Sequence, residues 1–190
     1  MTALNVRLTL HLPRGCSVRQ VYGSPPTFGA RTAEIALPDL ERGATIGKLW
    51  EVDWEPRTAG TYRVAKVLLA WDDPNTGRTE TVSANAVVEF LHDRARIAQG
   101  ADPTVAQELA VALASRDLER TMMGMRTQQL SAAEATMALE RTQALLAQQG
   151  RTGEASELAE ATRALRRGEE GGAEKTLIGT IYHLDQGKRT

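Results

Sequence analysis

The amino-acid sequence predicts an α+β protein in which an antiparallel β-sandwich is followed by an antiparallel helical bundle or hairpin array. Apolar residues in the first half recur with a period of two, which is the pattern of half-buried strands. From Asp102 onward they recur near every 3.6 residues, which is the pattern of amphipathic helices. We therefore expect two domains, a β-sandwich at residues 1–92 and a helical domain at residues 93–190.

The clearest strand begins at Leu4, where apolar and polar residues alternate up to Leu12. Most chains begin with a few loose residues, so a strand this close to Met1 favours an upstream domain in the parent protein. Further strand-like runs are Val18 to Tyr22, Ala33 to Leu37, Ile46 to Trp54, Tyr62 to Trp71 and Thr79 to Leu91. So many short strands without an intervening helical pattern indicate a β-sandwich.

The helical half carries its own start and stop signals. Asp102 is a suitable N-cap before Pro103, and this first helix should run to about Arg126. Its expected apolar stripe is Val105, Leu109, Ala112, Leu113 and Arg116.

Three more helices follow in the expected domain. Ser131 and Glu134 form a capping box for the second helix, which Gly150 should end. Thr152 should cap the third helix, which stops at Gly168. The fourth runs from about Ala173 to Leu184, and the alanine-rich faces should let the helices pack closely.

Composition excludes several functional classes. The net charge is −1, with basic and acidic residues balanced in both halves, so the basic field of a nucleic-acid-binding domain is missing. No segment approaches the roughly 20 apolar residues that a membrane-spanning helix needs. The single cysteine, Cys16, allows no intrachain disulfide, and we expect a soluble protein of the reducing cytoplasm.

Motifs that carry chemistry are also missing. The three histidines lack metal-ligand spacing, and there is no cysteine pair, phosphate-binding loop or nucleophile elbow. The run from Asp72 to Asn75 lacks the loop length and closing glutamate of a calcium site, so a capped hairpin turn is favoured. We therefore predict no metal, no cofactor, no catalytic residue and no enzymatic activity.

Two groups of side chains are candidates for an interaction surface. Met122, Met123 and Met125 cluster near the end of the first helix, where they form an adaptable binding surface or fill gaps in the core. Trp50 and Trp54 share one face of a strand, where they pack the sheet or stack against a ligand.

Several segments in this order resemble the region that follows the von Willebrand factor A domain in a group of bacterial proteins. The segments are Leu4 to Leu8, Val18 to Gly23, Leu37 to Gly43, Ala70 to Arg78, Thr81 to Ala84, and the alanine-rich helical tail from Asp102. In that family the metal-dependent adhesion site belongs to the A domain and carries an Asp-x-Ser-x-Ser motif. This motif is absent here, so no metal ligand is carried over to any residue of this chain.

The resemblance implies a non-enzymatic accessory module of a von Willebrand A-type protein. Such a module would mediate protein–protein association, through self-association or by positioning an A domain in the same parent chain. The alternative is a stand-alone ligand-binding sandwich, for example one for carbohydrate, with the helices as a brace. That alternative requires exposed tryptophan rings as stacking platforms.

Overall fold

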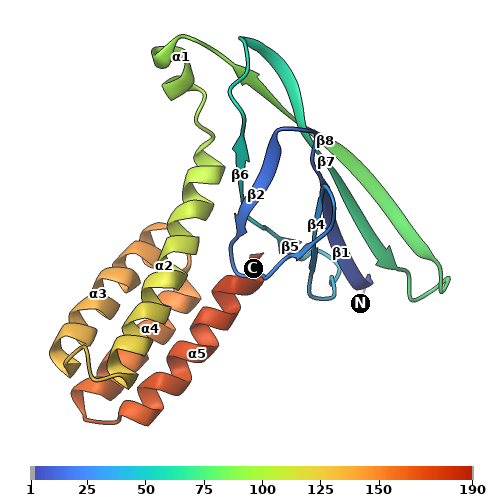
Figure 1. The fold of residues 1–190 in the computed structure, drawn as a ribbon. Helices are drawn as coiled ribbons and strands as arrows, with labels where there is room; N and C mark the ends of the chain where they lie inside the picture. The colour runs from blue at the N-terminus through green and yellow to red at the C-terminus, as the bar shows by residue number, and fades with distance from the viewer. Residues whose placement is uncertain (1–2, 190) are drawn as a thin grey trace. The chain divides into compact units, whose positions relative to one another are not determined.

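The computed structural model describes residues 3–189, which form two compact units (Figure 1). The first unit runs to Asp102 and also includes the C-terminal strand β9 (Lys188–Arg189), and the second is Pro103–Gly187. The predicted boundary after residue 92 lies earlier in the chain than this one. The short helix α1 (Arg94–Gln99), which was not predicted, belongs to the first unit.

The first unit is built on a five-stranded sheet in which every pairing is antiparallel. Its order is β3 (Thr27–Phe28), β4 (Thr32–Ala36), β1 (Leu4–His11), β7 (Gly60–Asp72) and β8 (Thr79–Phe90). With helices following this sheet along the chain, the α+β class is confirmed.

Two further sheets of the first unit have two strands each. One joins β2 (Cys16–Val21) to β6 (Trp50–Trp54), and the other joins β5 (Thr45–Ile46) to β9. The ring of Trp54 in β6 contacts that of Phe90 in β8, with 5.6 Å between centroids, so the β2–β6 sheet contacts the large sheet. The run predicted as one strand from Ile46 to Trp54 is therefore two strands with different partners.

The core of the first unit follows the predicted alternation in β1. Val6 and Leu10 are buried, and the residues between them are exposed or half-buried. Leu10 lies opposite Ala33 of β4, which is buried together with Ile35. Alternate residues of a strand point to the same face of the sheet, so these buried side chains lie on one face.

The second unit consists of α2 (Pro103–Arg126), α3 (Ala132–Gln148), α4 (Thr152–Arg166) and α5 (Glu170–Gln186). All four contribute to one continuous apolar core, which includes the completely buried side chains of Leu118, Leu139, Leu158 and Leu177. The helical spacing predicts one apolar stripe in α3, and its residues are buried except for the half-buried Ala138: Ala135, Ala138, Leu139, Thr142 and Leu146. The stripe predicted for α5, which is Leu177, Ile181 and Leu184, is buried as well. None of the helices described is long and apolar enough to cross a membrane.

The stripe predicted for α2 is wrong. Val105, Leu109 and Leu113 are exposed, whereas the buried face carries Val111 and Leu118. The predicted stripe and the buried residues lie on opposite sides of the helix, because a step of about 100° per residue places Leu113 about 200° away from Val111. At 1.5 Å per residue, the 24 residues of α2 span about 36 Å, whereas the 17 of α3 span about 25 Å. The first turns of α2 therefore extend past the other helices of the unit (Figure 1).

The helix ends confirm one predicted cap and correct another. Ser131 and Glu134 form the complete capping box at the start of α3. Thr152 is the first residue of α4 instead of its cap, and the N-cap Arg151 makes no side-chain capping bond. Gly150 and Gly168 follow α3 and α4 with φ of 76° and 78°, a conformation that glycine adopts without strain.

Candidate functional site

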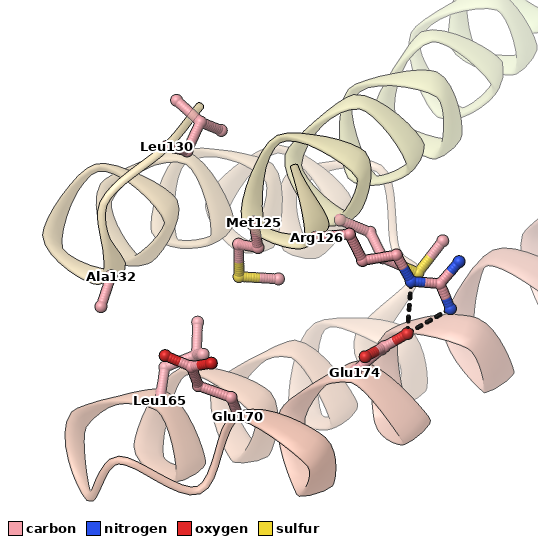
Figure 2. A pocket seen from close by; sticks show the side chains of 8 residues that line it. Met125, Arg126, Leu130, Ala132, Leu165, Glu170 and Glu174 are labelled. Atoms are coloured by element: carbon pink, nitrogen blue, oxygen red, sulfur yellow. Dashed lines mark hydrogen bonds and ion pairs between the residues drawn. The ribbon is translucent and has the colours of Figure 1, made fainter. Parts of the chain in front are cut away.

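Two of the predicted methionines line a small hollow in the helical unit, here called the methionine socket (Figure 2). Met122 and Met125 come from α2, Leu130 from the loop that follows it, and Leu165 from the end of α4. Its volume is about 90 Å³. Ligand pockets for drug-sized molecules measure about 300–1,000 Å³, so the socket has room for a single apolar side chain.

Charged side chains line the same hollow beside its apolar residues. Nε of Arg126 donates a hydrogen bond to Oε1 of Glu174, and Figure 2 shows this pair spanning α2 and α5. Glu170 lies beside them at the start of α5. With one cation and two carboxylates, the lining carries a net negative charge. The socket therefore favours an apolar side chain whose neighbouring groups are not acidic.

The third predicted methionine, Met123, does not line the socket. Successive residues of an α-helix lie about 100° apart around its axis, so Met122 and Met125 share a face from which Met123 is turned away. Met123 is exposed to solvent. Met122 and Met125 also pack against the helical core, which is the gap-filling role that methionine has in many cores.

Trp50 and Trp54 lie half-buried in β6. The Nε1 atoms of both indoles are buried, and neither finds a hydrogen-bond acceptor in the part of the chain that the structure describes. Trp54 packs against Phe90, which in turn makes an edge-on contact with Tyr62 at 5.5 Å between centroids. Trp54 thus packs within the first unit, and both indole nitrogens are enclosed.

The exposure of the edge strand β8 is a feature that the sequence pattern did not predict. The strand predicted from Thr79 to Leu91 places Val82, Ala84, Ala86, Val88 and Phe90 at alternate positions, as a strand with one apolar face does. Val82 and Val88 are 54% and 40% exposed, and Val87 on the opposite face is 56% exposed. Alternation shows that a strand has an apolar face, but it does not show whether another layer covers that face.

No cluster of metal-binding side chains is found in residues 3–189. No three His, Cys, Asp or Glu side chains in this range lie close enough to hold a metal ion. His11, His92 and His183 remain separate, on β1, after β8 and on α5. Cys16 is free and half-buried at the start of β2.

The acidic turn between β7 and β8 is a hydrogen-bonded hairpin turn. Hydrogen bonds from Asn5 Nδ2 at 2.9 Å and Thr79 Oγ1 at 2.7 Å lower the pKa of Asp72, and the first has the larger effect. The backbone N–H of Asn75, at 2.8 Å, lowers the pKa of Asp73. These carboxylates accept hydrogen bonds from donors within the chain, and the hydrogen bonds account for the conformation of the turn.

The sequence matches no family model and no curated protein. Two solved structures are similar to the chain in fold. One is a von Willebrand factor type A protein from Catenulispora acidiphila, with TM-score 0.57 and 18% identity, over 83% of this chain and 38% of that one. The other is the ArnB paralog VWA2 from Sulfolobus acidocaldarius, with TM-score 0.54 and 16% identity, over 94% of this chain and 42% of that one.

Parts of these two structures share the fold of this chain. The chain spans about two fifths of the length of each of the two structures. At these identities the similarity concerns the fold, and it bears out the resemblance to von Willebrand A-type proteins at that level.

Proposed function

We propose that the chain is a non-enzymatic accessory module of a von Willebrand A-type protein that mediates protein–protein association and positions the A domain. In this proposal the first unit acts as a β-sandwich and the second as a helical bundle. The fold similarity supports it, because most of this chain aligns with only about two fifths of two von Willebrand A-type structures. The chain would then correspond to one part of a larger assembly.

The missing motif supports an accessory part over the A domain itself. The Asp-x-Ser-x-Ser sequence that characterises the A-domain adhesion site does not occur anywhere in the 190 residues. Carboxylate and hydroxyl oxygens are the ligands that hard cations require. A chain without this set is suited to hold or orient an A domain, and we propose that it has no catalytic role of its own.

The observation that carries the proposal is the uncovered state of β8. This strand of 12 residues has a neighbouring strand, β7, on one side only among the described residues. Long exposed edge strands are normally protected by lysine, proline or bulges, because their free backbone groups pair with other chains. β8 contains no lysine or proline, and it exposes Val82, Val87 and Val88.

We propose that the A domain of the parent protein covers β8. Its contact would bury the exposed valines and satisfy the free backbone groups along the strand. One face of the strand carries Val82, Ala84, Ala86 and Val88, and Glu80 and Glu89 lie near the two ends of the strand. Such an arrangement suits a stable intramolecular contact, since apolar burial supplies the main free energy of association.

The carbohydrate-binding alternative lacks a specific supporting observation. It requires tryptophan rings exposed to solvent, whereas Trp50 and Trp54 are half-buried and their indole nitrogens are enclosed. A cytoplasmic location stays a prediction from the single, unpaired Cys16.

The test compares the chain with and without its A domain. The coding sequence upstream of residue 1 in the source genome should encode an A domain with the Asp-x-Ser-x-Ser motif. Amide hydrogen exchange in β8 should be slower in the joined protein than in this chain alone, because covered backbone groups exchange more slowly. Replacing Val82 and Val88 by Lys should remove most of that difference.

A matched control replaces both Ile178 and Tyr182 by Lys, which places the same two charges on exposed apolar residues of α5. It should leave the A-domain-dependent protection of β8 unchanged. Equal exchange of β8 in the two proteins would contradict the proposed contact. The absence of any A domain from the parent chain and from adjacent genes would contradict the accessory role itself.

A further inference from the structure

A cluster of basic side chains lines an open hollow of about 680 Å³ in the first unit, here called the basic hollow. Arg14, Arg31, Arg63 and Lys66 line it together with His11. They lie far apart in the sequence and come from the turn after β1, the start of β4 and strand β7. The local charge contrasts with the balance of basic and acidic residues in the whole chain.

Strand pairing brings two of these elements together. His11 ends β1 and lies opposite Thr32 of β4 on one side and Lys66 of β7 on the other. Directly paired residues point to the same face of a sheet, so these side chains share one face.

A β-bulge adds Arg63 to the same face. Arg63 and Lys66 are three residues apart and would face opposite ways in a regular strand. The register shifts between Arg63 and Ala65, so that Arg63 pairs with Val87 and Lys66 pairs with Asn85. Val87 and Asn85 are two residues apart on β8 and share a face, so their partners share it too. This re-aiming of a side chain is a common function of bulges.

Backbone contacts place the two loop arginines near the end of β1. The carbonyl of Arg31 accepts a hydrogen bond of 2.9 Å from the N–H of Leu12. The carbonyl of Arg14 accepts one of 2.9 Å from Nη2 of Arg57, which holds the turn in place. Both loops therefore present their side chains beside His11.

No acidic residue lines the basic hollow. Across residues 3–189, the side chains of Arg14, Arg31, Arg63 and Lys66 form no ion pair and no hydrogen bond. Other arginines of the chain are paired with carboxylates, as Arg19 is with Glu51 at 3.0 Å. Four unneutralised cations in one hollow create a positive potential that attracts anions.

We propose that the basic hollow binds an acidic segment, rich in aspartate and glutamate, of a protein partner. The open hollow distributes its cations over two loops and a strand, which suits several carboxylates spaced along a peptide. Leu12, Pro13 and Ala30 provide apolar contact for the carbon stems between them. Carboxylates that meet arginine gain charge-assisted hydrogen bonds.

Two other anions fit the lining less well. Single-stranded nucleic acid is held by bases stacking on aromatic rings, and no aromatic ring of Phe, Tyr or Trp lines the hollow. Phosphate groups are commonly cradled by successive backbone N–H groups of glycine-rich loops. No glycine lines the hollow, and Pro13 has no backbone N–H to donate.

The test is fluorescence anisotropy with a labelled ten-residue peptide of alternating Glu and Asp, titrated with the full chain. Binding should be detectable at low salt and should weaken at 0.15 M salt, where the screening length is about 8 Å. Replacing both Arg63 and Lys66 by Ser should weaken binding about tenfold, because the peptide loses two charge contacts. Arg31→Ser provides a second, independent variant with a smaller loss.

The matched control replaces Arg42 and Arg78 by Ser. Both are exposed residues of turns in the same unit and lie outside the hollow, so net charge changes equally. This control should alter binding less than about twofold, given the weakness of distant screened charges. Tryptophan fluorescence melting curves verify that every variant is folded.

Equal weakening by the two double variants would overturn the proposal, because net charge alone would then explain binding. Absence of peptide binding would overturn it as well. Binding of tripolyphosphate with no binding of the peptide would assign the hollow to a phosphate ligand instead. None of these outcomes depends on whether an A domain covers β8, so the two proposals fail separately.

Discussion

Both units of the chain leave some apolar side chains exposed, as α2 does with Val105 and Leu109, but the units differ in the backbone that carries these side chains. In the helical unit, Leu118, Leu139, Leu158 and Leu177 are completely buried in a core shared by four helices. In the first unit, β8 leaves all three of its valines exposed. A helix satisfies its backbone hydrogen bonds internally, whereas an edge strand leaves half of them open. The exposed valines of β8 therefore lie beside open backbone groups, whereas the exposed apolar residues of α2 do not.

The largest expected effect is the loss of a core leucine. Leu158 of α4 is 0% exposed, so Leu158→Ala should lower the free energy of unfolding of the helical unit by about 3 kcal/mol. Circular dichroism at 222 nm reports mainly the helices of the second unit. Tryptophan fluorescence reports the first unit, because Trp50, Trp54 and Trp71 all lie in β6 or β7.

The dichroism transition should shift in Leu158→Ala while the fluorescence transition stays in place. Val87→Ala in the exposed edge strand is the control, and it should change either transition by less than about 0.5 kcal/mol. A common shift of both signals in Leu158→Ala would show that the units unfold together and are not independent.

A smaller effect should distinguish two glycines of the helical unit. A Cβ at Gly124 in α2 would lie 2.6 Å from Cδ1 and 2.8 Å from Cγ of Leu130. Gly124→Ala should therefore destabilise the unit by about 1–3 kcal/mol through overpacking. A Cβ at Gly179 in α5 would meet no atom within 4 Å. Gly179→Ala should stabilise it by about 0.5–1 kcal/mol, through reduced freedom of the unfolded chain.

Urea denaturation followed by dichroism measures both changes. Opposite signs for the two variants are the expected result. Destabilisation by both variants would show that the position of Gly179 in helix α5 is packed against other atoms and is not open. The surface of α5 would then no longer contrast with the exposed edge strand β8 of the first unit.

Local signals in the sequence predicted much of this fold. The capping box at Ser131, the glycines that end α3 and α4, and the stripes of α3 and α5 all depend on residues within a few turns of one another. The stripe of α2 was wrong because apolar residues occur on both sides of this helix, and the pattern alone does not show which side faces the other helices. Short elements such as α1, β3 and β9 carry too few residues for a period to be visible.

The candidate sites depend on long-range placement, and the sequence predicted them only in part. Clustering along one helix indicated Met122 and Met125, and helical periodicity alone could have set Met123 apart. The basic hollow has no local signal, because its residues come from distant segments and a bulge sets the direction of Arg63. The exposure of β8 depends on which layers surround it, and an alternating pattern contains no information about those layers.

The smallest expected effects are pH-dependent, and they compare one exposed carboxylate in each unit. Hydrogen bonds from the Ser131 side chain and backbone lower the pKa of Glu134, and those from Asn5 and Thr79 lower that of Asp72. A carboxyl with a lowered folded-state pKa stabilises the fold above its unfolded-state pKa. That stabilisation is lost as the pH falls through the folded-state pKa. Both transitions should therefore move down on acidification.

Ser131→Ala should reduce the acid dependence of the dichroism transition alone, and Thr79→Ala that of the fluorescence transition alone. At neutral pH the lost helix cap should also cost the helical unit about 1 kcal/mol. Thr79→Ala should have the weaker effect on pH dependence, because the hydrogen bond from Asn5, which has the larger influence on the pKa of Asp72, remains. If Thr79→Ala changed the dichroism transition instead, the carboxylate of Asp72 would be coupled to the helices. The two units would then not respond to pH independently.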